Sequence, residues 1–238
     1  SLNITILPNE VITAGAKWSI DNGSSWNEGN VTFDNLEVGI YTVVFNDVTD
    51  WIKPQPISVM VSQGGHSTAT ASYLYYDSSV KTYIPDDNFE QILIDRGYDD
   101  VLDNYIITNN IKNITNLDVN GAGKDESKKI KDLTGIGGFV NLNRLVCSVN
   151  QISSLDVSNN SFLEVLYCHE NQLTSINVSK NAYLKELICD RNQLSVIDVS
   201  NNILLTRFSS SHNQLTSIDI SKNSVLNELS CYNNQLTE

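Results

Sequence analysis

The chain has 238 residues, 40% of them apolar, and a formal net charge of −13 from 15 basic and 28 acidic residues. This apolar content supports a sizeable core and excludes wholesale disorder. Because the acidic balance leaves no basic patch for phosphate groups, nucleic acids and anionic membranes are excluded as expected partners. No apolar run is long enough for membrane insertion, and without an initiator Met or signal peptide we expect a piece of a longer protein.

Residues 1–77 predict a β-sandwich. Short alternating apolar runs are separated by Gly, Asn and Asp at the spacing of sandwich strands, and the Asn22-Gly23 dipeptide predicts a hairpin turn. The expected strands are 2–7, 16–21, 30–36, 40–47, 56–62 and 67–75. With "LEVGIYTVVF" (36–45) and a threonine-rich last strand, this region resembles PEGA-like and other small immunoglobulin-like modules of bacterial surface proteins.

Three tryptophans in this region fit two roles. They fill a sandwich core, or they form a platform on which sugar rings stack. We favour the core and keep sugar binding as the alternative for Trp18, Trp26 and Trp51.

Residues 78–140 are expected to begin a repeat array. A helix is predicted over 84–97, because Asp87 and Glu90 form a D-x-x-E capping pattern and Gly97 suits a helix end. Since an open solenoid exposes its first core layer, this helix is the predicted N-terminal cap, with "NITNLDVNG" (113–121) as a degenerate first coil. Its apolar face contains Phe89, Ile92 and Leu93, and Ile84 is placed for a hydrophobic staple.

Two polar segments interrupt this part of the chain. The stretch "GAGKDESKK" (121–129) is expected to be a polar, mobile insertion. The acidic run 95–104 is a weak calcium candidate, because it lacks the alternating ligands and central Gly of an EF-hand loop. We therefore expect no bound metal there.

From residue 141 to 238 the sequence repeats every 21 residues as L-x-x-L-x-C-x-x-N-x-L. Leu145 and Cys147 are two apart, so one face of a short strand points inward, and successive copies stack as parallel strands about 4.8 Å apart. No copy buries its apolar face alone, but neighbouring copies bury it for each other. The recurring Asn at position 150 and its equivalents is expected to satisfy buried backbone groups at the turn.

These repeats resemble the leucine-rich-repeat family, in the short "LDVS" form of Bacteroidetes surface proteins and, more distantly, of internalins. The resemblance implies a solenoid with a parallel β-sheet on its concave face, in a secreted or cell-surface bacterial protein. The fold class expected for the whole chain is β-rich: an immunoglobulin-like β-sandwich, a small helical cap and a leucine-rich-repeat solenoid.

One core column holds a cysteine in almost every copy. A small, buryable side chain fits this position, since free Cys behaves as a small hydrophobe. Disulfides are disfavoured because the side chains point in parallel, and zinc needs ligands that converge. We expect free core thiols and no cofactor for the column of Cys147, Cys168, Cys189, Ser210 and Cys231.

The outward strand positions vary between copies, and function is expected there. Val146, Tyr167 and Ile188 predict an exposed apolar strip with a charged rim, which is the composition of a protein contact. The predicted protein-binding residues are Arg144, Val146, Val165, Tyr167, His169, Glu186, Ile188, Asp190, Arg191, Arg207, Glu228 and Tyr232.

Other chemistry on this surface is less favoured. Ser148, His169 and Asp190 stand in the order nucleophile, base and orienter, but an open ladder offers neither an oxyanion hole nor a closed pocket. A metal ion held by His169, Glu170, Asp190 and His212 is likewise less favoured than protein binding. The hydroxyl row is explained by turn preference rather than by binding of ice or polymers: Ser153, Thr174, Ser195, Thr216 and Thr237.

The first functional hypothesis is therefore a non-enzymatic protein-binding module. The alternative is a carbohydrate-binding or adhesive accessory region of a larger enzyme or adhesin, and a third is a structural stalk. The last repeat lacks a cap, which predicts end-to-end self-association through its exposed apolar end.

Overall fold

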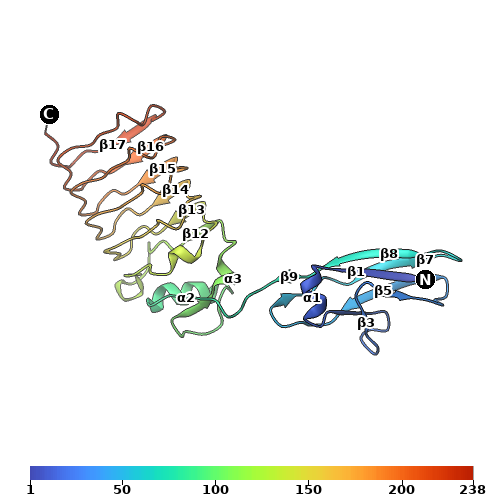
Figure 1. Cartoon of the computed structure of the whole chain (residues 1–238). Coiled ribbons are helices and arrows are strands. Elements are labelled where there is room, and N and C mark those ends of the chain that lie inside the picture. The colour runs from blue at the N-terminus through green and yellow to red at the C-terminus, as the bar shows by residue number, and fades with distance from the viewer. Residues whose placement is uncertain (238) are drawn as a thin grey trace. The chain divides into compact units, whose positions relative to one another are not determined.

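The computed structural model describes residues 1–237 and divides into two compact units, residues 1–78 and residues 79–237 (Figure 1). Each unit has its own hydrophobic core. The first is built from short strands in small sheets, and the second contains a parallel six-stranded sheet.

Two sheets enclose the core of the first unit. One has the order β4-β1-β8, with β1 and β8 parallel, and the other is antiparallel with the order β3-β2-β5-β7. A third pair joins β6 to β9. The elements are β1 Leu2–Leu7, α1 Asn9–Thr13, β2 Lys17–Ser19, β3 Asn27–Glu28, β4 Thr32–Phe33, β5 Gly39–Phe45, β6 Trp51–Ile52, β7 Ile57–Val61, β8 Ser67–Ser72 and β9 Leu74–Tyr75.

All the strand segments expected in this unit contain strands, and β2 and β3 form the hairpin that Asn22-Gly23 predicts. Sequence patterns missed α1 and the two-residue strands β3 and β6, which are too short to show a periodicity. Trp18 is fully buried and donates its Nε1–H to the Glu28 carbonyl at 2.9 Å, so the core role is confirmed for this tryptophan.

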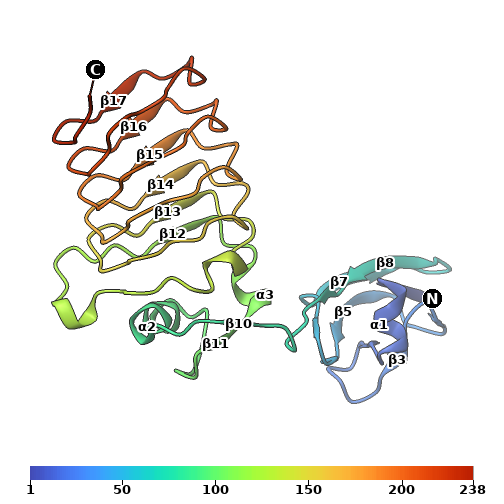
Figure 2. The same cartoon turned by 60° about the vertical axis from the view of Figure 1, so that its left-hand side comes forward.

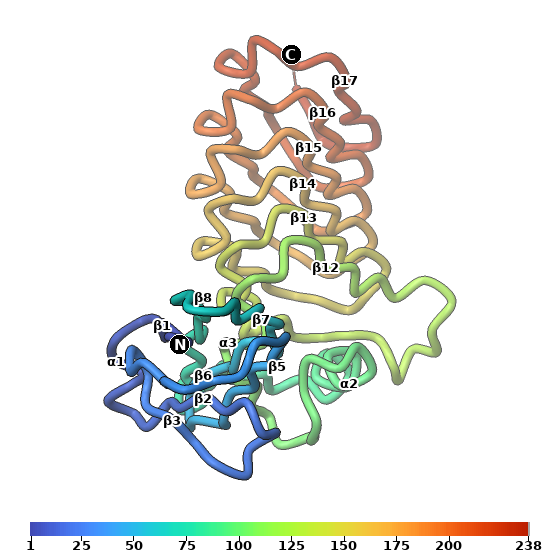
Figure 3. The backbone as a smooth tube through the Cα atoms, turned by 90° about the vertical axis from the view of Figure 1, so that its right-hand side faces the viewer, coloured from blue at the N-terminus to red at the C-terminus, as the bar shows by residue number. Residues whose placement is uncertain are grey.

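The second unit is a stack of coils whose strands form one parallel sheet in exact register (Figures 2 and 3). The strands are β12 Asn116–Asp118, β13 Arg144–Val146, β14 Val165–Tyr167, β15 Glu186–Ile188, β16 Arg207–Ser209 and β17 Glu228–Ser230. Their middle residues form a single interior row, Leu117, Leu145, Leu166, Leu187, Phe208 and Leu229. All but Leu229 are fully buried, because no described coil covers that last residue.

The cysteine column is part of this core. Cys147, Cys168 and Cys189 are buried free thiols, and Cys231 in the last coil is partly exposed. Burial raises the pKa of the Cys168 thiol to about 12 and raises those of Cys147 and Cys189 well above their usual range. Such thiols are unreactive, so the core interpretation of the column is confirmed.

Two ladders of buried asparagines satisfy the backbone between coils. Asn171 accepts from the Ile152 N–H at 3.0 Å and donates to the carbonyls of Cys147 and Cys168 at 3.0 and 3.1 Å. This is the role expected for the recurring Asn. Sequence reasoning missed the second ladder, in which each Nδ2 donates to carbonyls of the preceding coil, formed by Asn160, Asn181, Asn202 and Asn223.

The chain before the regular coils is irregular, and α2 lies at the β12 end of the stack (Figure 2). Ile84, Phe89 and Leu93 are buried in the same cluster as Leu117 and Leu145, so one core runs through both parts. The remaining elements are β10 Lys81–Tyr83, α2 Asp87–Asp95, β11 Tyr105–Ile107, α3 Thr108–Ile111 and the 3-10 turns Glu126–Lys128 and Ile136–Gly138.

The N-cap of α2 is Asp86, so the expectation of Asp87 is wrong by one residue. Asp86 has the extended backbone that an N-cap requires, and its Oδ1 accepts from the N–H groups of Asn88 and Phe89 at 3.0 Å. Its Oδ2 accepts from two further N–H groups, at positions 131 and 132. Gly97 ends the helix as predicted, with φ +73°.

The polar stretch 121–129 is tied to its surroundings. Asn88 donates to the carbonyls of Ser127 and Lys129 at 3.2 Å, and the Lys129 ammonium pairs with the Glu126 carboxylate at 2.6 Å. Hydrogen bonds from Asn88 therefore fix the C-terminal end of the 121–129 segment to the first turn of α2.

Candidate functional site

The outward side chains of β13–β17, together with the second and third residues after each strand, form a surface that we call the strand face. Because the strands are in register, equivalent residues lie side by side. One row contains Arg144, Val165, Glu186, Arg207 and Glu228. The next row contains Val146, Tyr167, Ile188, Ser209 and Ser230.

The expected apolar strip is shorter than predicted. Val146 is only 5% exposed, so its assignment as an exposed contact residue is wrong, while Tyr167 and Ile188 are half-buried. The reason is that outward side chains on adjacent strands lie about 4.8 Å apart, and Val146 is directly opposite the larger Tyr167. The accessible apolar part of this row is therefore Tyr167 and Ile188.

Tyr167 is held between two charged groups. The Arg144 guanidinium lies 4.9 Å from the centroid of the Tyr167 ring, and the Tyr167 hydroxyl donates to the Glu186 carboxylate. Burial, and next this hydrogen bond, raise the pKa of the Tyr167 hydroxyl. Farther along the row, Arg207 and Glu228 form an ion pair at 3.0 Å. The strand face thus presents an ordered aromatic group with charges of both signs around it.

The serine, histidine and aspartate do not form a catalytic triad. Ser148 and His169 are hydrogen-bonded, with 2.9 Å between Oγ and Nδ1, but Ser148 is fully buried. Among the residues that the structure describes, no hydrogen bond joins the Asp190 carboxylate to the His169 ring. The Asp190 Oδ1 accepts instead from the Ser209 hydroxyl and the Ser211 N–H, both at 2.6 Å. This arrangement stabilises the turn and leaves no base–orienter pair.

The third residue after each strand has the left-handed backbone conformation in every regular coil. Arg191 and Glu170 have positive φ values and exposed side chains, and Tyr232 is 61% exposed with its ring against His212 at 5.1 Å. The full left-handed column is Val149, Glu170, Arg191, His212 and Asn233. The turn therefore directs a different side chain outward in each coil.

A second apolar row lies outside the strand face and was missed by sequence reasoning. Phe162 and Tyr183 are about half exposed, with their rings stacked at 6.3 Å, and Leu204 and Val225 continue the row. The signal was available, because each residue directly precedes the first leucine of its repeat.

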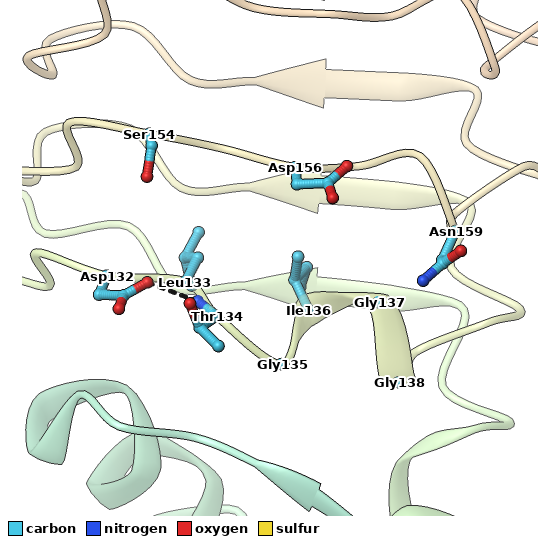
Figure 4. A pocket seen from close by; sticks show the side chains of 10 residues that line it. All are labelled: Asp132, Leu133, Thr134, Gly135, Ile136, Gly137, Gly138, Ser154, Asp156 and Asn159. Atoms are coloured by element: carbon cyan, nitrogen blue, oxygen red, sulfur yellow. Dashed lines mark hydrogen bonds between the residues drawn. The ribbon is translucent and has the colours of Figure 1, made fainter.

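A pocket of about 340 Å³ lies between the irregular coil and the first regular coil (Figure 4). Gly135, Gly137 and Gly138 line it from below, where the regular coils carry side chains, and Asp156 and Asn159 line it from above. The Asp156 carboxylate accepts from Ser158, which lowers its pKa, and Asp132 accepts from the Thr134 N–H at 2.7 Å. These carboxylates are thus engaged by their own turns.

Within residues 1–237, no group of three or more His, Cys, Asp or Glu side chains is arranged to hold a metal ion. None of the helices in the same range has the length and apolar character needed to cross a lipid bilayer.

Comparison with known structures identifies the coil architecture. The functional domain of InlJ from Listeria monocytogenes is similar at 34% identity and a TM-score of 0.60, over 68% of this chain and 36% of the InlJ chain. The chain carries a leucine-rich-repeat solenoid. The InlJ domain is described as including a cysteine ladder, and in this solenoid Cys147, Cys168 and Cys189 also occupy successive coils.

Two other Listeria monocytogenes internalins show weaker similarity. InlF is 20% identical with a TM-score of 0.49, over 66% of this chain and 58% of its own. InlC2 is 16% identical with a TM-score of 0.48, over 68% of this chain and 83% of its own. No protein-family model matches the sequence, and no curated protein matches it. The chain spans about a third of the InlJ structure that it matches, 36% of its length.

Proposed function

We propose that the solenoid is a non-enzymatic module that binds a protein through the strand face. The observation that carries this proposal is the arrangement of Arg144, Tyr167 and Glu186, in which an arginine and a carboxylate hold a half-buried aromatic side chain. Aromatic and arginine side chains dominate the binding energy of protein interfaces, and a side chain that is already ordered loses little entropy on binding.

The other parts of the chain would support this surface. We assign α2 as the cap that covers the first core layer, since it buries Phe89 and Leu93 against the coils. The first unit would act as an immunoglobulin-like spacer. The similarity to an InlJ domain supports a bacterial source, and we extend this to a secreted or cell-surface location.

The test compares two pairs of substitutions on different surfaces of the solenoid. Photo-crosslinking from a benzoylphenylalanine at Ile188 would capture the partner from the medium and surface extract of host cells. Binding of the identified partner would then be measured for Tyr167→Ala/Arg144→Ala and for Phe162→Ala/Tyr183→Ala. We expect the first pair to weaken binding by about a hundredfold and the second to leave it unchanged, since two interface anchors together contribute roughly 3 kcal/mol.

The opposite pattern would place the contact on the row that begins at Phe162 and would contradict the proposal. Unchanged binding in both double variants would contradict it as well. Circular dichroism of each variant would establish that the solenoid stays folded.

A further inference from the structure

The first unit has a pocket that the proposed function does not use. It has a volume of about 460 Å³ and lies between the 22–26 turn, the end of β5 and the segment 53–56. This size falls within the range of about 300–1,000 Å³ that small-ligand sites occupy. The residues that line it include the aromatic Trp26, the prolines Pro54 and Pro56, and the charged residues Asp47 and Lys53.

Trp26 differs from the other two tryptophans of the unit. Trp18 is buried with its N–H donated to a carbonyl, and Trp51 packs edge-on against Tyr75 at 5.1 Å. The Trp26 side chain is 40% exposed, and its Nε1–H has no hydrogen-bond partner among residues 1–237. An exposed indole with a free donor suits a ligand that offers both an apolar face and an acceptor.

The turn that carries Trp26 is held in one conformation. The Asp21 carboxylate accepts from the Ser19 hydroxyl at 2.6 Å and from the hydroxyl and N–H of Ser25 at 2.6 and 2.9 Å. These hydrogen bonds hold the pKa of Asp21 at about 2. Gly23 packs so closely against the indole that a Cβ there would lie 3.1 Å from the ring. The aromatic surface is therefore preorganised, which reduces the entropy lost on binding.

The polar groups of the pocket are available to a ligand. Asp47 and Lys53 form an ion pair at 2.8 Å whose side chains are 89% and 47% exposed. Such a pair stabilises the fold little, so both groups are free to turn toward a ligand at small cost. Asn46 is different, because its side chain accepts from the Lys17 N–H and donates to the Gly15 carbonyl.

We infer that this pocket binds a neutral oligosaccharide. The C–H face of a sugar ring stacks on the electron-rich face of the indole, while its hydroxyls donate to Asp47 and accept from Lys53 and the Trp26 N–H. Residues 1–78 contain 2 basic and 8 acidic side chains, a net charge of −6, which disfavours sialylated or sulfated sugars. The inference concerns the first unit alone and does not depend on protein binding by the solenoid.

The test follows the indole N–H signals of the full chain by ¹⁵N-NMR. The probes are lactose, cellobiose, maltotriose and N,N′-diacetylchitobiose, each titrated to about 10 mM, since single-site sugar affinities lie near the millimolar range. We expect at least one probe to shift the signal that Trp26→Phe removes, while the signals of Trp18 and Trp51 stay in place. Asp47→Ala, at an exposed position that leaves the fold intact, should weaken that probe about fivefold or more.

Three outcomes would overturn the inference. The first is that none of the four probes moves the Trp26 signal. The second is that 3′-sialyllactose or a proline-rich peptide moves it and the neutral sugars do not, because the pocket would then serve another ligand class. The third is an affinity for the sugar, measured by calorimetry, that stays unchanged in both Asp47→Ala and Trp26→Ala, which would place the sugar elsewhere. Lys17→Ala, outside the pocket, is the control variant expected to bind normally.

Discussion

The regular coils and the chain that precedes them differ in how their backbone N–H and C=O groups are hydrogen-bonded. In residues 141–237 the same hydrogen bonds from buried asparagines to backbone carbonyls of the preceding coil recur along the stack. Residues 79–140 do not repeat, and single residues make contacts that occur once, as when the Asp86 carboxylate accepts from four N–H groups. A contact that repeats in every coil can be predicted from the sequence, whereas a contact that occurs once depends on one specific residue.

Removing one asparagine of the repeated ladder should have the largest effect on stability. Asn171→Ala leaves the Ile152 N–H and the carbonyls of Cys147 and Cys168 without this partner in the core. The unpaired Ile152 N–H costs about 1–3 kcal/mol, and the two carbonyls, which keep donors from Asn150 and Asn192, lose one hydrogen bond each at about 1 kcal/mol, so we expect the free energy of unfolding to fall by roughly 3 kcal/mol or more. Urea unfolding followed by circular dichroism measures this loss.

The neighbouring Gln172→Ala is the matched control. Gln172 recurs in every repeat as the asparagine does, but its side chain is exposed, so the change should stay within about 0.5 kcal/mol. Equal losses in the two variants would show that the hydrogen-bond ladder is not what stabilises the coils.

Among the glycines of residues 79–140 with a positive φ, we expect substitution of Gly135 to lower the stability of the protein most. This residue has φ +97°, and a Cβ there would lie 2.5 Å from the Tyr83 carbonyl oxygen. We expect Gly135→Ala to lower the free energy of unfolding by about 2–3 kcal/mol, because backbone strain and a backbone clash add. Gly137→Ala is the control, since there the Cβ meets only the Asn159 side chain, at 3.0 Å and beyond. A smaller loss at position 135 than at 137 would contradict this assignment.

Glu90 at the same end should make stability depend on pH. It is fully buried, its Oε2 has no partner in the described chain, and Asp99 and Asp103 lie nearby. Burial raises the pKa of the Glu90 carboxyl above its usual 4.5. Above pH 4.5 the unfolded chain releases this proton more readily than the folded protein, so stability falls as pH rises through the folded pKa.

The variant Glu90→Gln should therefore be stabilised more at pH 8 than at pH 5. Its amide oxygen can still accept from the Asp103 N–H, which the Glu90 carboxylate accepts at 3.1 Å. Thermal unfolding at both pH values measures the difference in Tm. An increase in Tm that is the same at pH 5 and pH 8 would contradict a raised pKa of the Glu90 carboxyl in the folded protein.

The smallest change in the free energy of unfolding is expected for substitutions in the left-handed column, which begins at Val149. Val149 is the β-branched member of that column, with φ +58°, whereas Asn233 occupies the same position at φ +53°. Because asparagine tolerates this conformation and a β-branched residue does not, Val149→Asn should stabilise the protein by about 0.5–1 kcal/mol. Glu170→Asn should gain less, and a loss in Val149→Asn would contradict the strain argument. Chemical unfolding is again the measurement.

Sequence patterns predicted the parts of the molecule that depend on periodicity. The interior row from Leu145 onward, the thiol column and the role of the first asparagine ladder all follow from one repeat being stacked on the next. Where a single residue decides, prediction was weaker. The N-cap was placed at Asp87 instead of Asp86, because both are acidic and only the backbone conformation distinguishes them.

The sequence by itself determined that identical segments stack and which side chains they bury, because a 21-residue period repeats the same local geometry in every coil. Only the tertiary structure decided which outward residues stay accessible. Val146 is buried, and the Asp190 carboxylate accepts a hydrogen bond from the Ser211 N–H, because exposure depends on the size and hydrogen-bond partners of side chains on the adjacent strand. The pocket at Trp26 likewise arises where the 22–26 turn meets residues 44–47 and 53–56, and no local sequence pattern predicts that contact.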